Sequence, residues 1–148
     1  MVIIHAYTAD QQALMFSHPL CMPGSDATTL APDGPLANSV FHGAYTWASW
    51  YFHFMVYERK LLSAEDAVQR LTQLPAKRLG LADRGQLAQG YRADIAVFDA
   101  VRFQATATTF EPNQLARGMR HVVVNGVVTL RDGSLTGSRG GQVIRRSH

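Results

Sequence analysis

The chain has 148 residues, of which 47% are hydrophobic and 17% are charged. A chain of this length forms about one domain and can bury a real core, so disorder is excluded as its main state. No apolar run approaches the roughly 18 residues of a membrane-spanning helix, so we expect no membrane association. The net charge of +3 includes Arg145 and Arg146 near the end, and the sequence contains no basic stripe with interleaved aromatic residues. We therefore expect no nucleic-acid partner.

The first residues and the cysteine content bear on the cellular compartment. Residues 1–4 lead directly into His5, without a basic stretch followed by a long apolar run, so we expect no secretion signal. Cys21 is the single cysteine, which excludes an internal disulfide and a metal site built from cysteines alone. Because Cys21 lies in an apolar run, we interpret it as a small buried hydrophobic residue. These features predict a cytoplasmic protein.

The first part of the chain has the pattern of a strand, a helix and a second strand. Residues 2–4 form a short β-rich run, and Thr8 or Asp10 is suited to cap a helix that Pro19 ends. Residues 20–22 form an apolar run before a Pro-Gly turn, as a buried parallel strand does. Together these segments predict a βαβ unit.

A long loop and an aromatic helix follow. Residues 25–43 are rich in Gly and Pro and lack periodicity, and long loops in compact domains are usually functional or disordered. Residues 44–58 have a helical pattern with aromatic residues nearly all round, which predicts burial on more than one side. We interpret the rings as core packing, or as the wall of a substrate pocket near Tyr45. The aromatic residues are Tyr45, Trp47, Trp50, Tyr51, Phe52, Phe54 and Tyr57.

Two further helical segments precede a β-rich half. Ser63 caps the first, with Asp66 as a weak reciprocal partner; Pro75 begins the second and Gly80 ends it. The pattern then changes near residue 82. This change predicts two parts: residues 1–81, which are α/β, and residues 82–148, which form a small β domain.

The β-rich half contains predicted strands and turns in close succession. Residues 94–99 have a strand pattern, and residues 122–129 form a hairpin around an Asn-Gly turn. A turn at residues 132–133 and a last strand at residues 143–144 complete the half, whereas residues 103–117 are predicted to be a loop.

Local spacing reveals no complete catalytic site. The histidines stand at positions 5, 18, 42, 53, 121 and 148, and none forms a His-x-His, His-x-x-His or His-Glu-x-x-His motif. A Gly-x-Ser-x-Gly elbow and a phosphate-binding loop are also absent. Asp26 remains, after the predicted strand and turn, where barrel strands present catalytic groups. The alternative is that Asp26 is an ordinary turn or cap residue.

Several segments, in order, resemble the N-acyl-D-amino-acid deacylases (D-aminoacylases) of the amidohydrolase superfamily. The segment at residues 18–26 (HPLCMPGSD) resembles the "HP…GSD" motif of that family, and residues 58–81 resemble the two helices that follow it. The return to the small β domain is similar at residues 83–85 (DRG), 90–94 (GYRAD), 97–99 (VFD), 124–127 (VNGV) and 132–137 (DGSLTG).

The resemblance implies an α/β fold, the C-terminal portion of a (β/α)8 metallo-dependent hydrolase barrel plus part of a small β-sandwich. A barrel alone needs about 250 residues, so the chain resembles only the last two barrel strands, the final helices and part of the sandwich. The family's histidine ligands and bridging ligand would lie upstream. We therefore expect Zn²⁺ in the parent enzyme and none stably bound here.

The resemblance also implies roles for particular residues. Asp26 would be the catalytic general base toward a zinc-activated water, with a possible role as a metal ligand. His42 and Tyr45 are substrate-binding candidates. The family's arginine before the aromatic helix is missing from residues 41–45 (FHGAY), which leaves another amide or an imide open as the substrate instead of an N-acyl-D-amino acid.

Three hypotheses follow. The first is the C-terminal fragment of a zinc-dependent amidohydrolase that cleaves a linear amide and is inactive alone. The second is half of a split enzyme, whose exposed strand edges recruit a missing N-terminal part or a second copy. The third is a non-catalytic assembly or binding module that uses the aromatic helix as its contact surface.

Overall fold

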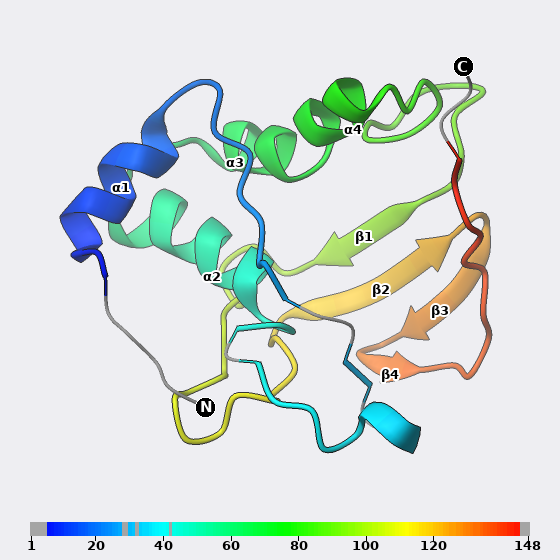
Figure 1. The fold of residues 1–148 in the computed structure, drawn as a ribbon. Helices are drawn as coiled ribbons and strands as arrows, with labels where there is room; N and C mark the ends of the chain where they lie inside the picture. Colours follow the sequence, from blue (N-terminus) through cyan, green and yellow to red (C-terminus); the bar gives the residue numbers. More distant parts are fainter. Residues whose placement is uncertain (1–5, 28–29, 32, 42, 146–148) are drawn as a thin grey trace.

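The computed structural model describes residues 6–27, 30–31, 33–41 and 43–145. Figure 1 shows the four α-helices grouped together, with a four-stranded antiparallel sheet of order β1-β2-β3-β4 beside them. The helical elements are α1 (Ala9–Ser17), the 3-10 turn η1 (Gly34–Leu36), α2 (Trp47–His53), the π-helix η2 (Phe54–Glu58), α3 (Ala64–Leu71) and α4 (Gln73–Leu79). The strands are β1 (Ile95–Phe98), β2 (Met119–Val124), β3 (Val127–Arg131) and β4 (Ser134–Leu135). No helix in the described ranges is long and apolar enough to cross a membrane.

Helix α1 begins as predicted, but the βαβ unit is not confirmed. Thr8 caps α1 through a reciprocal pair with Gln11, and the helix ends before Pro19. The predicted strand at residues 20–22 is wrong, since these residues form no strand and Leu20 and Met22 are exposed. A strand needs a neighbour for its backbone hydrogen bonds, and no described strand lies beside this segment. The predicted strand at residues 2–4 lies outside the described residues.

The aromatic helix forms the core. It begins at Trp47 rather than at residue 44, and it continues from α2 into the wider turns of η2. Tyr51, Phe52 and Phe54 are at most 4% exposed, which confirms burial on more than one side. Phe52 meets Phe98 of β1 edge to face at 5.3 Å between ring centroids, so the helix packs directly on the sheet.

The next two helices follow their local signals. Ser63 accepts a hydrogen bond of 3.0 Å from the backbone N–H of Asp66 at the start of α3. Helix α4 begins at Gln73, two residues before the predicted start at Pro75. Proline is tolerated in the first turn of a helix, because the N–H groups there have no partner within the helix and proline has no N–H to leave unpaired. Gly80 ends α4 in the left-handed conformation, as predicted.

The sheet confirms the hairpin and corrects one strand. Asn125 and Gly126 connect β2 to β3 with φ of 48° and 81°, the two positive values of a tight hairpin turn. The predicted turn at residues 132–133 is also present, between β3 and β4. The predicted strand at residues 143–144 is wrong, since these residues belong to no strand and Val143 is 88% exposed. An apolar composition does not provide the neighbouring strand that so short a segment needs for its backbone hydrogen bonds.

Candidate functional site

Asp26 stands on a tight turn and reaches solvent. Its side chain is exposed, and its backbone has a φ of 53°, in the left-handed region that aspartate tolerates better than most residues. Ser25 fixes the turn, because its Oγ accepts a hydrogen bond of 3.0 Å from the backbone N–H of Ala27. The turn therefore presents an accessible carboxylate.

The clamp around Arg70 holds the chain that leads to Asp26. The guanidinium donates hydrogen bonds to the carbonyl oxygens of Phe16 (2.7 Å), Ser17 (3.1 Å) and His18 (2.6 Å), at the end of α1. The carbonyls of Phe16 and Ser17 lack partners inside the helix, so the charged donor satisfies them, whereas the His18 carbonyl also accepts a hydrogen bond of 2.9 Å from the backbone N–H of Cys21. The end of α1 is thereby tied to α3.

Two side chains lie near this clamp. Burial raises the pKa of the Tyr51 hydroxyl, and the positive charge of Arg70 offsets part of that effect. Burial likewise raises the pKa of the Cys21 thiol, again with an opposing contribution from Arg70. Cys21 is half-buried, so the prediction of a buried hydrophobic residue holds only in part, and its raised pKa disfavours the reactive thiolate at neutral pH.

A cavity of about 550 Å³ lies beside Tyr45, the predicted pocket residue. Asp26 does not line it, although Ala31 and Ala37 of the same loop do. His42 lies outside the described residues. A second hollow of about 390 Å³ between α3, α4 and Pro19 does not include Asp26 either. The cavity beside Tyr45 is lined by Ala31, Ala37, Tyr45, Thr106, Asn113, Gln114, Leu115 and Arg117.

The far wall of this cavity comes from the segment predicted only as a loop. Arg117 pairs its backbone with Gln104 through two hydrogen bonds of 3.0 and 3.4 Å. Asn113 Nδ2 donates to the carbonyl oxygen of Ser39 at 2.8 Å and so joins both walls. Sequence reasoning missed these residues because they meet Tyr45 across more than 60 positions, and no local motif marks them.

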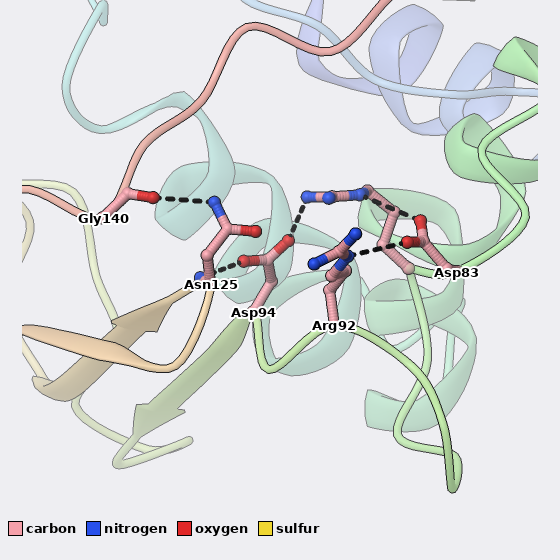
Figure 2. A network of polar contacts seen from close by, with 6 residues as sticks. Asp83, Arg92, Asp94, Asn125 and Gly140 are labelled. Atoms are coloured by element: carbon pink, nitrogen blue, oxygen red, sulfur yellow. Dashed lines mark hydrogen bonds and ion pairs between the residues drawn. The ribbon is translucent and has the colours of Figure 1, made fainter. Parts of the chain in front are cut away.

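A polar network joins the end of the helical part to the sheet (Figure 2). The carboxylate of Asp94 accepts hydrogen bonds from the Arg84 guanidinium and from the backbone N–H of Asn125 at 2.7 Å. The Asn125 side chain donates to the carbonyl oxygen of Gly140 at 2.7 Å. These contacts stabilise the hairpin turn and the closing segment, and we assign them a structural role.

The comparisons with known proteins point to one family. Residues 9–130 match the model of the Amidohydrolase family. An N-acyl-D-aspartate deacylase of Alcaligenes xylosoxydans xylosoxydans is 40% identical over 131 residues, which cover 88% of this chain and 25% of that protein. An N-acyl-D-glutamate deacylase of the same organism is 35% identical over 144 residues, 97% of this chain and 28% of that protein. The chain thus spans about a quarter of the length of the curated relatives it matches.

Solved structures agree. The N-acyl-D-glutamate deacylase from Bordetella bronchiseptica, complexed with zinc and a phosphonate mimic of the tetrahedral intermediate, matches with a TM-score of 0.79 and 34% identity. The match covers 93% of this chain and 27% of that chain. A crystal structure of D-aminoacylase matches with a TM-score of 0.65 and 36% identity over 68% of this chain and 21% of that chain.

Proposed function

The chain belongs to the amidohydrolase family, and on this basis we propose that it forms the C-terminal part of a zinc-dependent deacylase. The substrate we propose is an N-acylated amino acid, whose linear amide bond is hydrolysed. The observation that supports this most is the match to the zinc-bound N-acyl-D-glutamate deacylase over 93% of this chain. We further propose that residues 1–81 complete the barrel and residues 82–148 the small β domain.

The described residues do not fit a zinc site on their own. A zinc ion in a protein takes three or four protein ligands. In the described part of the chain, no group of three or more His, Cys, Asp or Glu side chains is placed to hold a metal. Asp26 would contribute one carboxylate at most, so the metal would be held mainly by the part of the relatives that this chain does not cover. Zn²⁺, when bound, polarises the amide carbonyl.

Asp26 is our candidate for the general base. An exposed carboxylate can accept a proton from the attacking water and return it to the leaving amine, and such transfer contributes about 10²–10⁴-fold to rates. The turn fixed by Ser25 holds this carboxylate at a defined place. Alone, the chain should hydrolyse little or nothing, because electrostatic stabilisation of the transition state is missing.

Two assays test this proposal. The purified chain, incubated with N-acetyl-D-amino acids with and without Zn²⁺, should release no amine. Hydrolysis that disappears in Asp26→Ala would overturn the inactivity while upholding the site.

In the second assay, the chain replaces the matching quarter of the N-acyl-D-aspartate deacylase. Zinc-dependent hydrolysis should then depend on Asp26, falling about 10²–10⁴-fold in Asp26→Asn but not in Asp33→Asn, an exposed carboxylate of the same loop. Full activity of Asp26→Asn would contradict the general-base role.

A separate complementing chain is the second candidate. Leu14, Met15, Leu20 and Met22 are between 42% and 74% exposed on α1 and the segment after it. Several exposed large apolar side chains within one short stretch of chain are typical of a surface that another part of a protein covers. Light scattering after size exclusion should show association of the chain with itself or with an N-terminal part, and a clean monomer in both cases would contradict this candidate.

The third hypothesis loses its main support. A contact surface on the aromatic helix requires exposed rings, whereas Tyr51, Phe52 and Phe54 lie in the core. The other rings of this segment, Tyr45, Trp47, Trp50 and Tyr57, are half-buried, so the complete burial that would exclude recognition is not reached, and packing is the role of the three buried rings.

A further inference from the structure

We propose that the cavity beside Tyr45 binds a small carboxylate and that Arg117 is the specificity-determining residue that recognises it. The identification of the ligand as an N-acylated amino acid rests on the function proposed above. The anion site itself rests on the chemistry of the cavity walls.

The cavity has the size and charge of a site for a small anion. Its volume of about 550 Å³ lies within the roughly 300–1,000 Å³ of small-molecule sites. Among the described lining residues, Arg117 is the one charged side chain, and no carboxylate stands beside it in that lining. Arg117 also forms no ion pair with a carboxylate in the described ranges. Its charge is thus available to a ligand.

The neutral lining residues complete a site for an N-acyl amino acid. A guanidinium can bind a carboxylate through two parallel N–H···O hydrogen bonds. The Tyr45 hydroxyl and the Asn113 amide supply donors for an acyl oxygen, and the Thr106 hydroxyl, whose proton is held by the Leu115 carbonyl oxygen, supplies an acceptor for an amide N–H. Leu115 and the two alanines provide the apolar surface that an acyl chain or a small side chain requires.

The walls are fixed before any ligand binds. The backbone pairing with Gln104 holds Arg117 at its Cα, and Thr106 Oγ1 donates to the carbonyl oxygen of Leu115 at 2.5 Å. Asn113 joins the two loops through Ser39. Since ordering a binding loop costs affinity, a wall that is already held loses less when the ligand enters.

The positive charge of the cavity comes from Arg117 and not from the long loop before the aromatic helix. The resemblance to the deacylases implies an arginine before the aromatic helix, and residues 41–45 contain none. Arg117 reaches the same cavity as Tyr45 from the other wall. The cation is therefore supplied from the small β half of the chain rather than from the long loop.

The test is an NMR titration of the isotope-labelled chain with N-acetyl-D-alanine and with its carboxamide. The two probes have nearly the same shape and differ in the negative charge. The acid should bind about tenfold more tightly than the carboxamide, with saturable shifts in the backbone amides of residues 104–117. Arg117→Gln should abolish this preference, Arg117→Lys should retain part of it, and Arg120→Gln, an exposed arginine on β2, should leave it unchanged.

The outcomes separate this proposal from the proposed function. Equal binding of acid and carboxamide, or an unchanged preference in Arg117→Gln, would overturn the anion site. Neither result depends on metal or hydrolysis, so the deacylase proposal stands or falls on its own assays. Unchanged dispersion of the amide spectrum would show that each variant is folded.

Discussion

Arg70 of α3 donates a hydrogen bond of 2.6 Å to the backbone carbonyl oxygen of His18, 52 positions earlier in the chain. The same guanidinium reaches the carbonyl oxygens of Phe16 and Ser17, so one side chain closes the end of α1. This contact sets where the chain leaves α1 and turns toward Asp26. A shift in the point where the chain leaves α1 would displace Asp26, the candidate general base.

Arg70→Gln should lower the free energy of unfolding by about 2 kcal/mol, because three carbonyl oxygens lose a charged donor. Urea denaturation measures this change. Arg78→Gln is the matched control, since Arg78 is an exposed arginine of α4, and it should change stability by less than about 0.5 kcal/mol. Equal stability of the two variants would show that the clamp contributes nothing.

Gly118→Ala should destabilise the chain by about 3 kcal/mol or more, through backbone strain and a steric clash. Gly118 has a φ of 85°, and an added Cβ would stand 2.5 Å from the carbonyl carbon of Arg102. Gly90→Ala separates the two effects, because Gly90 has a φ of 84° and open space around it. It should cost only about 1–2 kcal/mol in denaturant unfolding. Similar losses in both variants would rule out the clash.

Phe52→Ala should cost about 3–5 kcal/mol, since it leaves a cavity between α2 and the sheet. The Phe52 ring is 1% exposed and contacts both Phe98 and Phe103. Thermal unfolding measures the loss. Phe110→Ala, at a position that is 94% exposed, should stay within about 0.5 kcal/mol of the parent chain. A mild effect of Phe52→Ala would mean that the helix and the sheet unfold independently.

The Asp83 carboxyl should make the free energy of unfolding depend on pH. A hydrogen bond from Arg92 at 3.0 Å, assisted by Arg84, lowers the pKa of the Asp83 carboxyl from the ordinary value of 3.8. Its folded-state pKa is below the unfolded one, so its contribution is present above pH 3.8 and is lost as the pH falls through the lowered value. The advantage of the parent chain over Asp83→Asn, followed by thermal unfolding, should therefore shrink below pH 3.8. A constant difference would contradict this account.

Elements with short-range signals could be predicted from the sequence. Thr8 with Gln11, Ser63 with Asp66, and the Asn125-Gly126 turn each place donor and acceptor, or two positive φ values, within a few residues. The family was likewise predictable, because its motifs keep their order along the chain.

Elements that need a distant partner were not predictable in the same way. The apolar run at residues 20–22 has strand composition, but composition supplies no neighbouring strand. The cavity wall formed by Arg117 depends on loops that meet only in the folded chain. The place of Asp26 relative to substrate stays a prediction, since Asp26 lines neither cavity described.

The π-helix after α2 determines the direction, around the helix axis, in which the residues that follow it point. Its wide turn closes with a hydrogen bond of 2.8 Å from the Arg59 N–H to the Phe54 carbonyl oxygen, five positions earlier. Arg59 then pairs with Asp10 of α1 at 2.8 Å. Deleting one residue between 54 and 58 would restore ordinary helical geometry and rotate Arg59 by about 100°, away from α1. One inserted residue thus determines which neighbouring helix this arginine meets.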